Sequence, residues 1–222
     1  MPDPHRIKNE LEQLLATPHC TALLYHRNQF RDPKKPPDTP ATIAAATADW
    51  VFKNNPLLNP VEVLELRGYV EFYRAHDGRS GRKTAGTLGG SWVERSVVEE
   101  IWKATAAQQG AARERLFMEF MRTANFVKPE WNAMLFIACM AVPVGNFVVV
   151  LRGRGNWKAM QTPPTPGPPK PGAPPAIRTP DDVMRHLGMM PIPGTRQCVV
   201  PLFNDNWIQP VPKGSSKWPF LT

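Results

Sequence analysis

Tyr73 and Arg74 end a segment, Leu66–Arg74, whose alternating side chains predict a strand. A strand-end arginine offers a rigid, charged fork for phosphate oxygens. A Gly-rich stretch follows and leads into Thr87–Trp92 (TLGGSW). Glycines let the backbone approach a diphosphate, a helix N-terminus adds N–H donors, and Trp92 could stack on a flat ring. This order of residues is typical of a site for a nucleotide such as NAD.

Each of these residues also has a purely structural interpretation. Ser91–Glu94 (SWVE) has the form of a capping box, in which Ser91 begins a helix. Trp92 is then a core residue at the start of that helix, and Arg74 a surface ion-pair partner. The dinucleotide fingerprint G-x-G-x-x-G is missing, so a Rossmann site is not predicted.

Histidines and cysteines give little sign of a metal site. His19, Cys20 and His26 lack a fourth ligand at a familiar spacing, and the three cysteines form no C-x-x-C pair. We therefore expect no metal and reduced thiols. His76 stands beside Asp77 at the start of the Gly-rich stretch, where it could be a general acid–base, a phosphate ligand or a solvated loop residue.

The charge balance favours acidic partners. The chain has 222 residues with 27 Lys and Arg against 19 Asp and Glu, a net charge of +8. Basic residues gather at 74–83 and at 152–158, the latter beside Trp157. Such clusters suit nucleic acid as well as a dinucleotide, although no RRM, zinc-finger or KH signature is present. A non-catalytic module that binds nucleic acid or a protein therefore stays open.

The remaining pattern predicts an α+β chain. Apolar periodicity and turn residues indicate further strands at 134–142, 146–152 and 197–203, with the first two joined by a hairpin or a tight connection. We expect helices at 5–16, 42–52, 111–124 and 179–187, and another that begins at Ser91. Nine prolines make residues 161–180 a semi-rigid loop.

The first residues and the apolar runs bear on location. The N-terminal residues lack the apolar stretch of a secretory signal, and the longest apolar run, 133–144, is shorter than the roughly 20 residues of a membrane span. We expect a chain made in the cytoplasm and not held in a membrane, with export by a route that needs no cleaved signal left open.

The order Tyr73–Arg74, Gly-rich loop and Thr87–Trp92 resembles the front half of the ADP-ribosyltransferase-like toxin fold. Val142–Gly145 and Pro193–Pro201 are similar to the back half of its NAD-glycohydrolase branch, typified by the tuberculosis necrotizing toxin. The resemblance covers about residues 66–210. It implies a compact split antiparallel sheet with flanking helices, within a domain at 61–222 that follows an N-terminal extension at 1–60.

The resemblance also implies a function and a site. The chain would be a secreted toxin or effector that consumes NAD, with a cognate immunity protein as a further partner. Arg74 would hold the diphosphate, together with Tyr73 and Thr87, and Trp92 would line the nicotinamide side. Gln197, Ser91 and His76 would form the catalytic group.

The sequence departs from that family at one point of the chemistry. Classical ADP-ribosyltransferases carry a glutamate on the final motif strand, where its carboxylate stabilises an oxocarbenium-like transition state. No glutamate follows Glu130 here. Hydrolysis assisted by Gln197 therefore fits better than transfer, while Glu94 and Glu99 remain available as carboxylates on the expected helix.

Overall fold

The computed structural model describes residues 4–18, 20, 39–54, 58–76, 91–124, 136–154 and 197–211. Thr87, the Pro-rich loop 161–180 and the helix expected at 179–187 lie outside them. The helices are α1 (Pro4–Leu15), α3 (Pro40–Asn54), α5 (Arg95–Ala104) and α6 (Gly110–Ala124), with the 3-10 turn η2 (Asp205–Trp207). The strands are β1 (Leu58–Arg67), β2 (Val70–His76), β3 (Ser91–Glu94), β4 (Phe136–Val142), β5 (Phe147–Arg154), β6 (Gln197–Val199) and β7 (Ile208–Val211).

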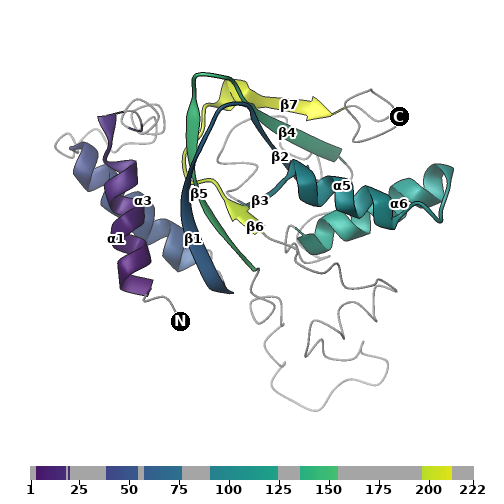
Figure 1. Ribbon diagram of the computed structural model, residues 1–222, viewed down its shortest axis with the longest axis horizontal. Coiled ribbons are helices and arrows are strands. Elements are labelled where there is room, and N and C mark those ends of the chain that lie inside the picture. Colours follow the sequence, from purple (N-terminus) through teal and green to yellow (C-terminus); the bar gives the residue numbers. More distant parts are fainter. Residues whose placement is uncertain are drawn as a thin grey trace, which may run out of the picture.

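The described strands form one antiparallel sheet in the order β1-β5-β6-β3-β2-β4-β7. The short strand β3 joins its two halves. Ser91 and Trp92 pair with β6, whereas Val93 and Glu94 pair with β2. Figure 1 shows that the strands β1 and β5 of one half cross the direction of the strands β4 and β7 of the other half at a steep angle. The α+β class with an antiparallel sheet and flanking helices is confirmed.

Two tight connections carry the chain between the halves. Gly68 and Tyr69 link β1 to β2, and residues 143–146 link β4 to β5. Gly68 and Gly145 have φ values of 89° and 87°, which a side chain with a Cβ adopts only with strain. The linked strands do not pair with each other, because each belongs to a different half of the sheet. The 143–146 segment is thus the tight connection that the sequence allowed, and not a hairpin.

The sheet has an inner face and an outer face. We call inner the face whose apolar residues form a single cluster from both halves, without any contribution from the α-helices. Its members are Phe72, Trp92, Ala138, Met140, Val142, Val148, Val150, Cys198, Val200, Phe203, Trp207 and Ile208. The inner face therefore holds the halves together, and Trp207 of the C-terminal segment packs on it.

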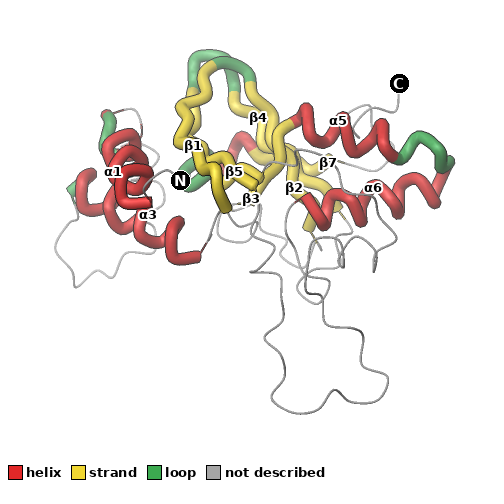
Figure 2. The backbone as a smooth tube through the Cα atoms, turned by 60° about the horizontal axis from the view of Figure 1, so that its bottom comes forward, coloured by secondary structure: helices red, strands yellow, loops and turns green. Residues whose placement is uncertain are grey.

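The outer face carries two separate clusters, one on each half. Helices α5 and α6 cover β2 and β4, with Val97, Val98, Ile101 and Trp102 as the buried stripe of α5. Helices α1 and α3 cover β5 and β6, through residues such as Leu11 and Leu15 against Val199. Figure 2 shows these helix pairs at opposite ends of the sheet. Residue 60, the expected domain boundary, falls inside β1, and the preceding helices share a core with the sheet.

Three local predictions were wrong. The single strand expected at 66–74 is two strands, because Gly68 breaks it. Ser91 does not cap a helix: Ser91–Glu94 is a strand, and α5 begins at Arg95 with Glu94 as a cap that makes no side-chain hydrogen bond. The last strand, expected to reach residue 203, ends at Val199. Partners in both halves of the sheet stabilise Ser91–Glu94 as a strand, which outweighs its capping sequence.

Candidate functional site

Polar side chains gather on the inner face where the halves separate. Arg74 is the first residue of β2 beyond its last pair with β3, Tyr73–Val93. It lies opposite Ala138 of β4, a member of the inner cluster, so its side chain shares that face. From the other half, Arg152 lies opposite Cys198, which in turn lies opposite Trp92. One face thus brings together two guanidinium groups from opposite sides of the split.

The environment of the Arg74 guanidinium disfavours its positive charge. Burial lowers the pKa of its guanidinium to about 10. The group is still protonated at neutral pH, and burial makes this protonated form less favourable than it is in water. An anion bound nearby would favour the protonated form.

Glu94 brings a carboxylate to the same face. Its Oε1 is 3.7 Å from Nε of Arg152, and the two side chains are 20% and 21% exposed. That separation exceeds a hydrogen bond, and within the described residues the buried Nε of Arg152 makes none. Glu94 also lies opposite Phe72, which makes it the diagonal neighbour of Arg74 across the β2–β3 pair. Glu94 thus shares the inner face with both guanidinium groups and is paired with that of Arg152.

Trp92 is a core residue. Its side chain is 0% exposed and packs edge-on against Phe203, with 5.7 Å between ring centroids. No ring face is open for stacking, so the packing agrees with the structural interpretation of this residue. Its buried Nε1 has no hydrogen-bond partner in the described part of the chain. Trp92 therefore presents to a ligand neither an open ring face nor an accessible N–H donor.

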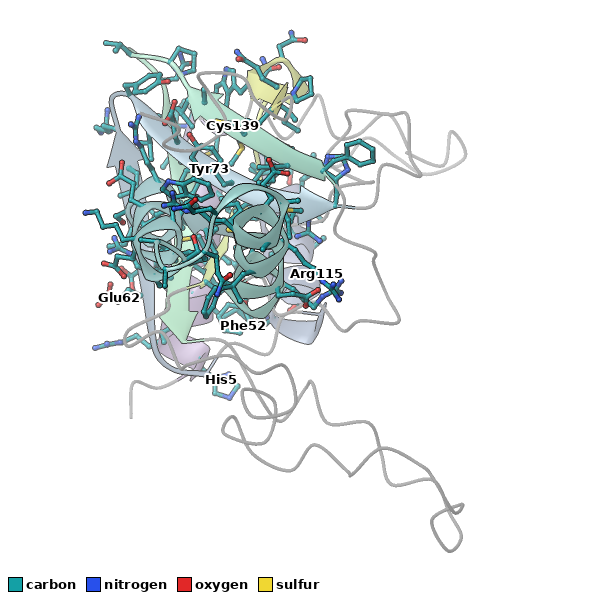
Figure 3. The ribbon with its side chains drawn as sticks, turned by 90° about the vertical axis from the view of Figure 1, so that its right-hand side faces the viewer. His5, Phe52, Glu62, Tyr73, Arg115 and Cys139 are labelled. Atoms are coloured by element: carbon teal, nitrogen blue, oxygen red, sulfur yellow. The ribbon has the colours of Figure 1, made fainter. Side chains whose placement is uncertain are left out.

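Tyr73 lies on the outer face, opposite to Arg74, because neighbouring residues of a strand alternate. Its hydroxyl donates to Glu71 Oε2 at 3.0 Å, and Arg95 Nη1 donates to the same oxygen at 3.0 Å. Burial and the adjacent Cys139 raise the pKa of Tyr73. Figure 3 shows Tyr73 and Cys139 close together on their paired strands. The structure thus gives Tyr73 a part in the packing beneath α5, away from Arg74.

Gln197 also lies away from the inner-face group. It is buried, and it lies opposite Gly153 at the start of β6. Strand alternation puts it on the face of Val199, whose cluster includes α1 and α3, whereas Cys198 belongs to the inner cluster. Gln197, a predicted catalytic residue, therefore lies on the face opposite to Arg74 and Trp92. Leu202 belongs to the same cluster as Val199, whereas Val200 belongs to the inner cluster.

His76 does join Arg74. It follows two residues later on β2, so the two share the inner face. Its ring contacts that of Phe136 on β4, with 5.7 Å between centroids and 32° between planes. Phe136 is 50% exposed and was not singled out in the sequence, because one phenylalanine at the end of an apolar run carries no signal.

For Ser91, the structure describes the backbone. The backbone of Ser91 pairs with Val199, and its catalytic role stays a prediction. Among the described residues, no group of three or more His, Cys, Asp or Glu could hold a metal ion. None of the described helices has the length and apolar character needed to cross a membrane. No family model, curated protein or solved structure matches the chain.

Proposed function

We propose that this chain is an NAD-consuming enzyme, a toxin or effector of the ADP-ribosyltransferase-like fold, which cleaves the bond between nicotinamide and ribose. The observation that carries the proposal is the inner-face group of Arg74, Glu94 and Arg152. It combines cations for a diphosphate with the carboxylate that the final strand lacks. The split antiparallel sheet, whose halves pair through β3 in the described part of the chain, supports the fold assignment.

Arg74 is the proposed diphosphate ligand. A guanidinium can give two parallel N–H bonds to phosphate oxygens, and such charge-assisted bonds are about twice as strong as neutral ones. The partial burial of Arg74 excludes competing water and strengthens the attraction. Arg152, from the other half of the sheet, adds a second positive charge on the same face, with 21% of its side chain exposed.

Glu94 is the proposed catalytic carboxylate, in place of Gln197. When the C–N bond breaks, its electron pair goes to the nicotinamide ring and neutralises the ring's positive charge. The ribose carbon becomes electron-poor, and a nearby carboxylate stabilises it. Water then forms a bond to that carbon and loses a proton, which yields ADP-ribose. Glu94 is suited to this work because its carboxylate is paired with Arg152 and one-fifth of its side chain is exposed.

The test is incubation of the full chain with NAD, followed by separation of nicotinamide and ADP-ribose. Release of both in equal amounts supports hydrolysis, and ADP-ribose bound to an added protein would indicate transfer. No release, together with oligonucleotide binding that weakens steeply with salt, would support the non-catalytic nucleic-acid module instead. That alternative draws on the same cations, Arg74 and Arg152.

A further inference from the structure

An aromatic surface adjoins Arg74 on the inner face. Phe136 and His76 are register partners on β4 and β2, and their rings are in contact. Phe136 is half exposed although most of its strand is buried. A large apolar ring left open beside a buried polar site is the kind of surface that a ligand ring covers.

The position of this pair relative to Arg74 matches the layout of a nucleotide. Arg74 and His76 are alternate residues of β2, so their Cα atoms lie about 7 Å apart along one face. A nucleotide places its flat ring one ribose away from its phosphate, a comparable span. Phosphate on Arg74 would therefore bring a ring over Phe136 and His76. Stacking on an aromatic side chain tolerates many bases, because every base has a π-face.

We infer that Phe136, supported by His76, is the stacking platform for one ring of a bound nucleotide, in the role that the sequence assigned to Trp92. This inference rests on the proposed NAD site and adds its ring-binding residue. The shared chemistry is a flat heteroaromatic ring joined through ribose to phosphate. In NAD that ring is either adenine or nicotinamide, and the two mononucleotides separate these sources.

The experiment is calorimetric titration of the full chain with AMP, nicotinamide mononucleotide and inorganic pyrophosphate. Replacing Phe136 by Ala should weaken binding of one mononucleotide by about tenfold or more, the usual size of a base–aromatic stack. Pyrophosphate has no ring, so its affinity should not change. Phe136→Tyr keeps the ring and should bind as the wild type does. Val144→Ala, an exposed apolar residue of the β4–β5 connection, is the matched control.

If the Ala variant does not fold, the same titrations are made with Phe136→Leu, which keeps apolar bulk at this position without a π-face. Unchanged affinity of either variant for both mononucleotides would overturn the platform, as would an equal loss for pyrophosphate. A wild-type chain that binds neither mononucleotide overturns it as well. Ring-dependent binding without any nicotinamide release would instead leave the platform standing and refute the proposed cleavage.

Discussion

Arg152 of β5 and Glu94 of β3 form an ion pair, with 3.7 Å between Nε and Oε1. Strand β6 lies between their two strands in the sheet. The pair connects strands that are not hydrogen-bonded neighbours in the sheet. It forms because both residues project from the same face and both side chains are long enough to reach over β6. The carboxylate is thereby brought to the line where the halves of the sheet separate, beside Arg74.

Replacing Glu94 by Gln should reduce nicotinamide release by about a hundredfold or more, the scale of losing one preorganised electrostatic contact in an active site. The fold should survive, because a partly exposed ion pair contributes only about 0–1 kcal/mol. Turnover is measured as initial rate and stability as thermal unfolding. Glu100→Gln, on the exposed side of α5, is the control. Full turnover in the Glu94 variant would remove this residue from the chemistry.

Arg74→Met should weaken NAD binding more than it lowers the stability of the chain. Loss of a charge-assisted phosphate contact is worth about 1.5–3 kcal/mol, or roughly ten- to a hundredfold in affinity. The apolar side chain fills similar space at this partly buried position, so the loss of thermal stability should be small beside the loss of affinity. Titration with NAD and thermal unfolding give the two values. A large fall in stability with unchanged affinity would instead make Arg74 a structural residue.

Leu11→Ala should destabilise the whole folded unit by about 2–5 kcal/mol, the range for a buried leucine. Leu11 of α1 belongs to the cluster that contains Val149 and Val199 of the sheet. Denaturant unfolding should therefore show one transition at lower concentration than in the wild type. Glu10→Ala, one residue away and exposed, should leave it in place. Separate transitions would show that residues 1–60 form a unit of their own.

The tyrosines beside Glu71 should titrate late. A hydrogen bond to Glu71 raises the pKa of Tyr69 to about 12, and burial raises that of Tyr73 as well. The unfolded chain loses these protons near pH 10, before the folded chain does. Their contribution to stability is thus present below about pH 10 and is lost as the pH rises toward 12.

Absorbance titration of tyrosinate is the measurement. Glu71→Gln should move one of the late transitions to lower pH, and Tyr69→Phe should abolish that same transition. If Tyr69 titrates near pH 10 in the wild type, its hydrogen bond to Glu71 does not persist in solution.

The helices and most strands were predictable from the sequence because their signals are local. The apolar stripe Val97, Val98, Ile101 and Trp102 predicts a buried helix face whatever the neighbours are, and all four are buried in α5. Helices α1, α3 and α6 likewise lie where the periodicity puts them, within about two residues at each end. The position of His76 on the face of Arg74 was not predicted, because the strand was expected to end at Arg74 and β2 continues to His76.

The composition of the site depended on the tertiary structure. Helices α1 and α3, more than 140 residues earlier in the chain, decide which face of β6 is the outer one. They share a cluster with Val199, so Gln197, on the same face as Val199, lies on the outer side. Phe203 packs against the ring of Trp92, which is buried. Glu94 pairs with Arg152 because β6 lies between their strands and brings them within reach of each other. Sequence spacing fixes which residues alternate along one strand. It does not fix which strands become neighbours, since that follows from long-range packing of apolar faces.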